Sequence, residues 1–429
     1  MKQVDIQTNK TNYSVSFTIK SRNMKNTSIL AIGGAAFAAS MASAMAQDSA
    51  PLFQIGNVNV RPHASYSVVY DDNIFLEHKS KFLGTQGNPG RDHDFVHTFT
   101  PGLKLDAGDA AARQSAYFRA NYEAAFTRFT HNSGSDATDH NVLVGVGGKL
   151  NRLQVGVEQT LQSRSDADAA NLAANGRVKR KTWETKIDSD YEVSEKTSLS
   201  LNLKQTIGDY NAPLFDSVDR SATLFLDYQV LPKVKMGVGG GAGYLQVDGT
   251  AANHNANSAY YQGLVRLTWE ATEKLNITAT GGLEHRNIQE RGAADPDGLV
   301  FGVSANWKAS EQTTVSLSAT RGKKASNAQV AQLNEETAIT GSIQHSLFDR
   351  VSLNLDGGYS YSHYKATSTA AGALRDDNYF FAKPALTYRF VERAQASLYY
   401  QYRRNDSTAV ANGNDFYNNQ LGLELSYSF

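Results

Sequence analysis

Apolar and polar residues alternate along the chain from Val60 to its last residue. In the segment 116–127 every second position is apolar or aromatic: Ala116, Phe118, Ala120, Tyr122, Ala124 and Phe126. The positions between them carry polar groups, among them Arg119 and Glu123. An alternation with period two predicts a β-strand with one apolar and one polar face. Because the same pattern returns in segment after segment, we expect an all-β chain.

The connections between the predicted strands alternate strictly between short and long. The short ones are charged turns such as Asn151-Arg152, and the long ones are rich in Gly, Asn, Asp and Ser, as in 164–177. A soluble sandwich has no reason to sort its loops by length, whereas a transmembrane barrel has short periplasmic turns and long extracellular loops. We therefore predict a transmembrane antiparallel up-and-down β-barrel over residues 60–429. It has about 18 strands, or about 16 if a register is misjudged, of roughly ten to fourteen residues each, and both termini are periplasmic.

The chain ends in a strand pattern, Gln420–Phe429, whose apolar positions run to the final residue: Leu421, Leu423, Leu425, Tyr427 and Phe429. In hydrocarbon an unpaired backbone N–H or C=O is costly, so an open sheet edge is not viable. We therefore expect this strand to close the barrel by pairing with the first one. Its aromatic end, Tyr427 and Phe429, resembles the signal read by the barrel-assembly machinery of bacterial outer membranes. The alternative is the buried last strand of a soluble β-sandwich.

The N-terminus carries a pattern typical of secretion. Met24-Lys25-Asn26 precedes the apolar stretch Ile29–Ala39, and Ala44-Met45-Ala46 fits the small-residue rule of signal peptidase. We predict an over-called extension over residues 1–23, a signal peptide over residues 24–46 and a periplasmic lead-in over residues 47–59. A single membrane anchor is the alternative, which the short length and the small residues disfavour.

Composition narrows the function classes. The 429 residues include 42 basic and 42 acidic side chains, so no basic excess exists to bind nucleic acid. Cysteine is absent, which removes disulfides, thiolate metal sites and cysteine nucleophiles. A mean hydropathy of −0.44 argues against a helical membrane protein. The 34 Gly, 21 Tyr and 19 Phe residues suit a barrel with aromatic girdles.

Signatures of an enzyme are missing from the sequence. It contains no G-x-S-x-G, H-E-x-x-H or P-loop motif. The ten histidines are scattered, and nothing selects one of them as the partner of a catalytic serine in an outer-membrane lipase. We expect neither an enzyme nor a protein that holds a cofactor or metal ion.

If the apolar face meets lipid, the polar face lines the lumen, and its charged residues are the candidate site. We select ten of them: Lys104, Arg119, Glu123, Glu158, Lys204, Asp227, Arg266, Glu270, Glu284 and Arg286. Their signs nearly balance, so no strong selectivity for anions or cations is expected. The plainer interpretation is that these charges only pair with one another in water, where exposed pairs contribute little energy. Glycines on the same face of residues 237–243 would leave room in the lumen or mark curvature.

A short motif occurs twice, as Asp71-Asp72-Asn73 and as Asp376-Asp377-Asn378. Carboxylates and amides offer oxygen ligands, so one interpretation is a cation or sugar site at the outer rim. The favoured interpretation is Asx-turn chemistry where a strand meets a loop. Neither copy has the ligand spacing of an EF-hand loop.

The segment Pro62–Phe75 (PHASYSVVYDDNIF) resembles the first strand of the putative β-barrel porin 2 family, and Thr100–Asp106 (TPGLKLD) resembles its second strand. The resemblance implies an outer-membrane barrel and identifies no catalytic residues. Members of the family are often associated with exopolysaccharide or capsule export, which implies a polysaccharide conduit. Alginate-type export barrels have strongly basic lumens, and the balanced charge here departs from them, so an acidic polymer is disfavoured.

Three functions follow as hypotheses. The first is an outer-membrane pore that assists the export or passage of polysaccharide, together with periplasmic polysaccharide-export components. The second is a general or solute-specific diffusion porin, which would work alone. The third is a barrel with a filled lumen that serves as a structural or adhesive surface protein. Trimeric porins usually fold one long loop into the lumen, and here the loop 71–93 is the only candidate by length, which favours a different architecture. In every case the expected partners include outer-membrane lipid and the barrel-assembly machinery.

Overall fold

The computed structural model describes residues 52–78, 92–109, 116–167, 177–212, 214–248, 257–289, 296–327, 332–366, 374–408 and 415–429. The predicted N-terminal extension and signal peptide lie outside these residues. In the described part the chain consists of β-strands and one short 3-10 turn. No helix in that part is long and apolar enough to cross a membrane.

The elements have the following bounds in chain order: β1 Phe53–Ile55, β2 Val58–Asp71, β3 Asp94–Ala107, β4 Tyr117–Phe129, η2 Ser133–Ser135, β5 Ala137–Leu150, β6 Leu153–Arg164, β7 Arg180–Glu192, β8 Thr197–Tyr210, β9 Ser217–Leu231, β10 Val234–Val247, β11 Ser258–Thr272, β12 Leu275–Ile288, β13 Gly298–Lys308, β14 Thr313–Ala325, β15 Gln332–Phe348, β16 Val351–Ala366, β17 Asp376–Val391, β18 Ala394–Ser407 and β19 Phe416–Ser428.

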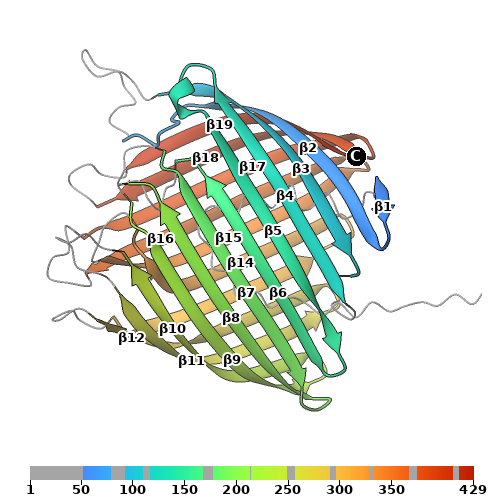
Figure 1. Ribbon diagram of the computed structural model, residues 1–429, viewed down its shortest axis with the longest axis vertical. Coiled ribbons are helices and arrows are strands. Elements are labelled where there is room, and N and C mark those ends of the chain that lie inside the picture. The colour runs from blue at the N-terminus through green and yellow to red at the C-terminus, as the bar shows by residue number, and fades with distance from the viewer. Residues whose placement is uncertain are drawn as a thin grey trace, which may run out of the picture.

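Strands β2 to β19 form one closed antiparallel ring in which each strand pairs with its sequence neighbours (Figure 1). The ring closes between β2 and β19, where Tyr70 lies opposite Leu421 and Ala64 lies opposite Tyr427. At the end of this seam the Phe429 N–H donates to the Pro62 carbonyl at 2.9 Å. The predicted barrel of eighteen strands, closed by its terminal strand, is therefore confirmed.

The short strand β1 lies outside the ring. It pairs with the start of β2, with Gln54 opposite Asn59, across a turn in which Gly56 has a φ of +59°. Figure 1 shows β1 next to the C-terminus at one end of the barrel. The predicted lead-in, residues 47–59, thus contains a strand and the first residues of β2. The sequence interpretation did not find this hairpin because Phe53–Ile55 is too short to show a period.

The outward face of the ring is apolar and aromatic. Exposed aromatic side chains lie near the short-turn end of several strands: Tyr191, Tyr228, Trp269, Trp307 and Tyr388. Others lie near the opposite end: Tyr70, Phe95, Tyr261 and Phe380. Aliphatic residues such as Leu423 and Leu398 fill the band between them. Two aromatic girdles around an apolar band are typical of a barrel in an outer membrane.

The connections are sorted less strictly by length than the sequence pattern predicts. The β3–β4 connection, residues 108–116, is longer than the β4–β5 connection, residues 130–136. The latter is compact because the Asp94 carboxylate accepts backbone N–H groups of His131 and Asn132 at 3.0 and 2.8 Å and draws this loop onto β3. Strand length was also underestimated, since β15 has 17 residues.

Candidate functional site

The polar faces of the strands line the interior of the barrel. There, acidic and basic side chains of neighbouring strands form ion pairs along the inner wall. Arg119 on β4 pairs with Glu158 on β6. It reaches that partner across Gly145 of β5, which has no side chain in the way. On β7 and β8, Lys186 and Lys204 hold Glu184 at 2.6 and 2.9 Å.

Glu123 on β4 is held by a histidine and two side-chain amides. His63 Nε2 lies 3.2 Å from its carboxylate, and the amides of Asn121 and Asn141 donate at 3.1 and 3.3 Å. Lys104 lies nearby on β3, opposite Asn121. The carboxylate is therefore bonded from three strands.

A deeply buried pair joins Arg266 of β11 to Asp227 of β9. Asp227 is 1% exposed, and Arg266 reaches it with both Nε, at 3.0 Å, and Nη2. The Ser200 hydroxyl of β8 also donates to the carboxylate, at 3.2 Å. The guanidinium lies over the Phe225 ring, 4.1 Å from its centroid. These contacts fix the pair flat against the wall.

A second buried cluster surrounds Glu284 on β12. Arg286 Nε donates to it at 2.9 Å, Gln262 donates at 2.8 Å, and Lys323 Nζ of β14 lies at 3.4 Å. Arg286 stacks on the Tyr260 ring at 4.5 Å. Glu270 is not brought into either cluster, since it lies exposed near the short-turn end of β11.

The inward glycines of β10 are covered by side chains of the neighbouring strands. Asp227 lies against Gly237, Phe225 against Gly239, Gln262 against Gly241 and Tyr260 against Gly243. The missing side chains thus do not widen the lumen at these points. They give large inward side chains a place to lie along the wall.

A Gly243→Val substitution is expected to destabilise the barrel by about 1–3 kcal/mol, because an added Cβ collides with the Tyr260 ring. Tyr260 has little freedom to move, since its hydroxyl donates to Asp219 at 2.9 Å. The inward Gly302 is the matched control, because an added Cβ there meets nothing within 4 Å. Urea unfolding of both variants in lipid vesicles measures the difference. Equal losses would contradict the packing role of Gly243.

The β8–β9 connection and the β14–β15 connection meet over the lumen at the long-loop end of the barrel. The Phe215 N–H donates to the Asn327 carbonyl at 2.8 Å, and the Asn327 amide donates back to the Phe215 carbonyl at 2.8 Å. Phe215 also packs with Leu245, Val247 and Leu333. Because Leu245 and Val247 face inward on β10, the end of the β14–β15 hairpin bends into the mouth of the barrel.

The seam side of the mouth is covered by residues just after β2. Leu76 packs with Ala167 and with Phe416 and Tyr379, which face inward from β19 and β17. Leu76 of the loop 71–93, the one candidate by length, therefore lies against inward-facing residues at the mouth. Shorter segments also enter, which length could not predict.

The two copies of the repeated motif lie in different settings. At the seam, Asp71 accepts the backbone N–H of Asn73 at 2.9 Å, an Asx turn, and the amides of Asn418 and Gln420 at 2.5 and 2.7 Å. Asp72 accepts the backbone N–H of Asn419 at 2.7 Å and its side-chain amide at 2.8 Å. The first copy thus ties the first strand to the last.

In the second copy, Asp376 and Asn378 face outward and bond to Tyr361 and Tyr359. Asp377 is buried with Arg375, whose Nε donates to it at 3.0 Å. Among the described residues, no cluster of three carboxylate or imidazole groups could hold a metal ion.

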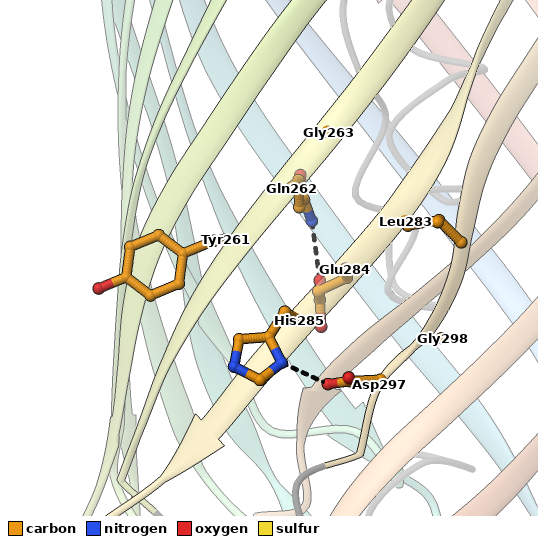
Figure 2. Close-up of a pocket in the computed structure, with 8 residues that line it drawn as sticks. All are labelled: Tyr261, Gln262, Gly263, Leu283, Glu284, His285, Asp297 and Gly298. Atoms are coloured by element: carbon orange, nitrogen blue, oxygen red, sulfur yellow. Dashed lines mark hydrogen bonds and ion pairs between the residues drawn. The ribbon is translucent and has the colours of Figure 1, made fainter.

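A shallow hollow of about 510 Å³ lies on the wall at β11 and β12. Figure 2 shows the Tyr261, Leu283 and His285 side chains on one face and Gln262 and Glu284 behind the strands. The backbone N–H of Arg286 and the His285 ring hold the pKa of Asp297 below its usual value. Gly263 lies within the hollow, which the absence of its side chain deepens.

Several residues that complete these clusters escaped the sequence interpretation. Asn418 and Gln420 lie on the polar face of the terminal strand, and pairing that strand with β2 would have pointed to them. His63 on β2 and Asn327 after β14 show no signal in the sequence, because their partners lie far away along the chain.

The family model described as putative beta-barrel porin 2 matches residues 215–429. No curated protein sequence matches the chain. Among solved structures, the FrpB iron transporter of Neisseria meningitidis is similar at a TM-score of 0.47 and 10% identity, over 88% of this chain and 82% of that one. OpdK of Pseudomonas aeruginosa, solved with vanillate, gives 0.43 and 11%, over 86% and 99%. A loop-deletion variant of OmpT of Vibrio cholerae gives 0.38 and 12%, over 87% and 100%.

The fold rests on the observed strand pairing and the family on the sequence match. That match covers half of the chain and includes the closing strand β19. The chain belongs to the putative beta-barrel porin 2 family and is a porin-like β-barrel of the bacterial outer membrane.

Proposed function

We propose that this barrel is a non-enzymatic diffusion pore for small, uncharged or zwitterionic solutes rich in hydroxyl groups, such as short saccharides. One observation carries the proposal: the charged side chains of the lumen are paired across strands, as in Lys204–Glu184 and Arg266–Asp227. Paired charges leave little net field to select ions, yet they offer hydrogen-bond donors and acceptors side by side. A hydroxyl group can use both.

A second candidate for the solute is a long polysaccharide rather than a short saccharide. The contact between Phe215 and Asn327 over the mouth favours a smaller solute, because an extended polymer would have to displace both segments. In the orientation we propose, the long loops are extracellular and both termini are periplasmic. The terminal Tyr427 and Phe429 then stand where the barrel-assembly machinery would read them.

The refolded barrel in a planar bilayer is expected to conduct with a cation-to-anion permeability ratio between about 0.3 and 3, because the lumen charges cancel. Reversal potentials in a salt gradient measure this ratio, and added maltose or longer oligosaccharides should reduce the current. Lys204→Ala leaves Glu184 with one cation fewer and should shift the ratio toward cations. Lys181→Ala, on the outward face of β7, is the control and should not.

A strong ion selectivity of the unmodified barrel, or a current indifferent to saccharides, would contradict the proposed solute class. An absence of any current would instead favour the structural or adhesive alternative. It would also fit an exporter that opens only with a periplasmic partner.

A further inference from the structure

A row of polar side chains crosses the outward wall within the apolar band. Gln159 of β6 lies opposite Thr185 of β7, Thr185 lies opposite Gln205 of β8, and Gln205 lies opposite Arg220 of β9. Their neighbours Glu158, Glu184 and Lys204 point into the lumen, so this polar row points outward. The side chains bond to one another: Thr185 donates to Gln159 at 2.6 Å and Arg220 donates to Gln205 at 3.0 Å.

Apolar residues flank the polar row on both sides. The row nearer the long loops consists of Leu161, Trp183, Ile207 and Val218. The row nearer the short turns consists of Val157, Ile187, Leu203 and Ala222. The polar row therefore does not mark the edge of the membrane.

Another part of the wall shows what a lipid-facing row looks like. Leu386, Leu398, Leu423 and Val68 lie opposite one another across β17, β18, β19 and β2. All four are apolar. An amide turned toward hydrocarbon is costly, so the polar row on β6–β9 needs a different neighbour than lipid chains.

Small residues adjoin the polar row. Ala222 lies opposite Ala242, and Gly240 lies opposite Gly263. A Cβ added to Gly263 would meet nothing within 4 Å, and the hollow beside Tyr261 and Leu283 begins there (Figure 2). Small residues that allow close approach and polar side chains that bond across the contact characterise helix–helix contacts inside membranes. The same two effects, close packing and hydrogen bonding, are available to a barrel wall.

We propose that the outward wall of β6–β11 is the surface through which two copies of this chain associate in the membrane. The amides of Gln159 and Gln205 both donate and accept, so the row can bond to a second copy of itself. Arg220, the one charged member, lies near the long-loop end of β9 and is already bonded to neutral amides of Gln205 and Gln246. The N–H donors of Arg220 are therefore bonded within its own copy, and its place near the long-loop end keeps the charge close to water.

The size of the surface suits a stable dimer, which a contact of one wall with the same wall of a second copy produces. Six neighbouring strands about 4.8 Å apart, each contributing about ten residues at about 3.3 Å, cover roughly 950 Å² on each copy. A standard specific interface buries about that much per partner.

The test is the oligomeric state of the full barrel, extracted in mild detergent and measured by density-matched analytical ultracentrifugation. The unmodified chain is expected to be dimeric. Ala222→Trp places a large ring in the contact and should weaken association at least tenfold. Ala382→Trp, an equivalent change on β17, should leave it unchanged. A monomeric unmodified chain at every concentration, or equal behaviour of both variants, would overturn the proposal.

A second variant tests the same contact in case Ala222→Trp disturbs folding. The pair Gln159→Leu and Gln205→Leu should also weaken association if the row bonds to a second copy. If the row faced lipid, the same change would leave association as it is and raise resistance to urea. If another outer-membrane protein covered the row, the isolated chain would stay monomeric, which counts against a second copy.

Crosslinking in intact membranes measures the association of copies without detergent. The chain has no cysteine of its own, so a single Ala242→Cys can be linked between copies by a bismaleimide. A linked dimer is expected for Ala242→Cys and none for Ala382→Cys on β17. Equal linking of both positions would indicate random collision.

Discussion

Replacing Asp71 by alanine is expected to lower the free energy of unfolding by about 3 kcal/mol and to open the seam between β2 and β19. The Asp71 carboxylate is buried and accepts hydrogen bonds from Asn73, Asn418 and Gln420. Removing it leaves those donors without their partner in a place where water cannot replace it, and each such loss costs about 1–3 kcal/mol. Urea unfolding in vesicles and the heat-dependent mobility of the barrel in detergent gels measure the effect.

The second copy of the motif supplies the control. Asp376 bonds to His363 and Tyr361 on the outward face, where it is half-exposed. Asp376→Ala should therefore cost less than about 1 kcal/mol. Equal stability of the two variants would contradict the proposal that Asp71 stabilises the seam between β2 and β19.

Removing the guanidinium of Arg266 is expected to cost about 3–5 kcal/mol, because it leaves the Asp227 carboxylate buried without a counter-charge. The Arg266→Ala change also removes the cation above the Phe225 ring. Adding Asp227→Asn to the same chain removes the stranded charge and should restore much of the loss. Unfolding of the single and double variants gives the coupling between the two residues.

Arg119→Ala is the matched change in the same lumen. Its pair with Glu158 is more open, with the two side chains 40% and 24% exposed. Water can therefore solvate the Glu158 carboxylate, and the expected loss is at most about 1 kcal/mol. A similar loss of stability for Arg119→Ala and Arg266→Ala would mean that burial does not determine how much each ion pair contributes to the free energy of unfolding.

The sequence predicted which charged residues line the lumen, but not which of them form ion pairs with one another. Alternation placed Arg119, Glu158 and Lys204 on the polar face, and near-equal charge predicted weak selectivity. Which charge pairs with which depends on the register between strands. Lys323 illustrates the limit, since the end of β14 bends inward and brings this residue to Glu284 on β12.

The repeated motif shows why similar sequences need not share a role. Asp71 and Asp376 both stand where a strand meets a long loop, so local chemistry treats them alike. Only the closed ring places Asn418 and Gln420 beside Asp71, because that contact joins residues at the two ends of the chain.

The sequence by itself determined the strands, their apolar and polar faces and the closure of a barrel. These follow from period-two alternation and from the cost of an unpaired backbone in hydrocarbon, which are local or general effects. The tertiary structure alone decided which inward charges meet, which segments cover the mouth and where a polar row interrupts the lipid-facing wall. Those features arise from side chains brought together across strands and loops, and their distances along the chain carry no repeating pattern.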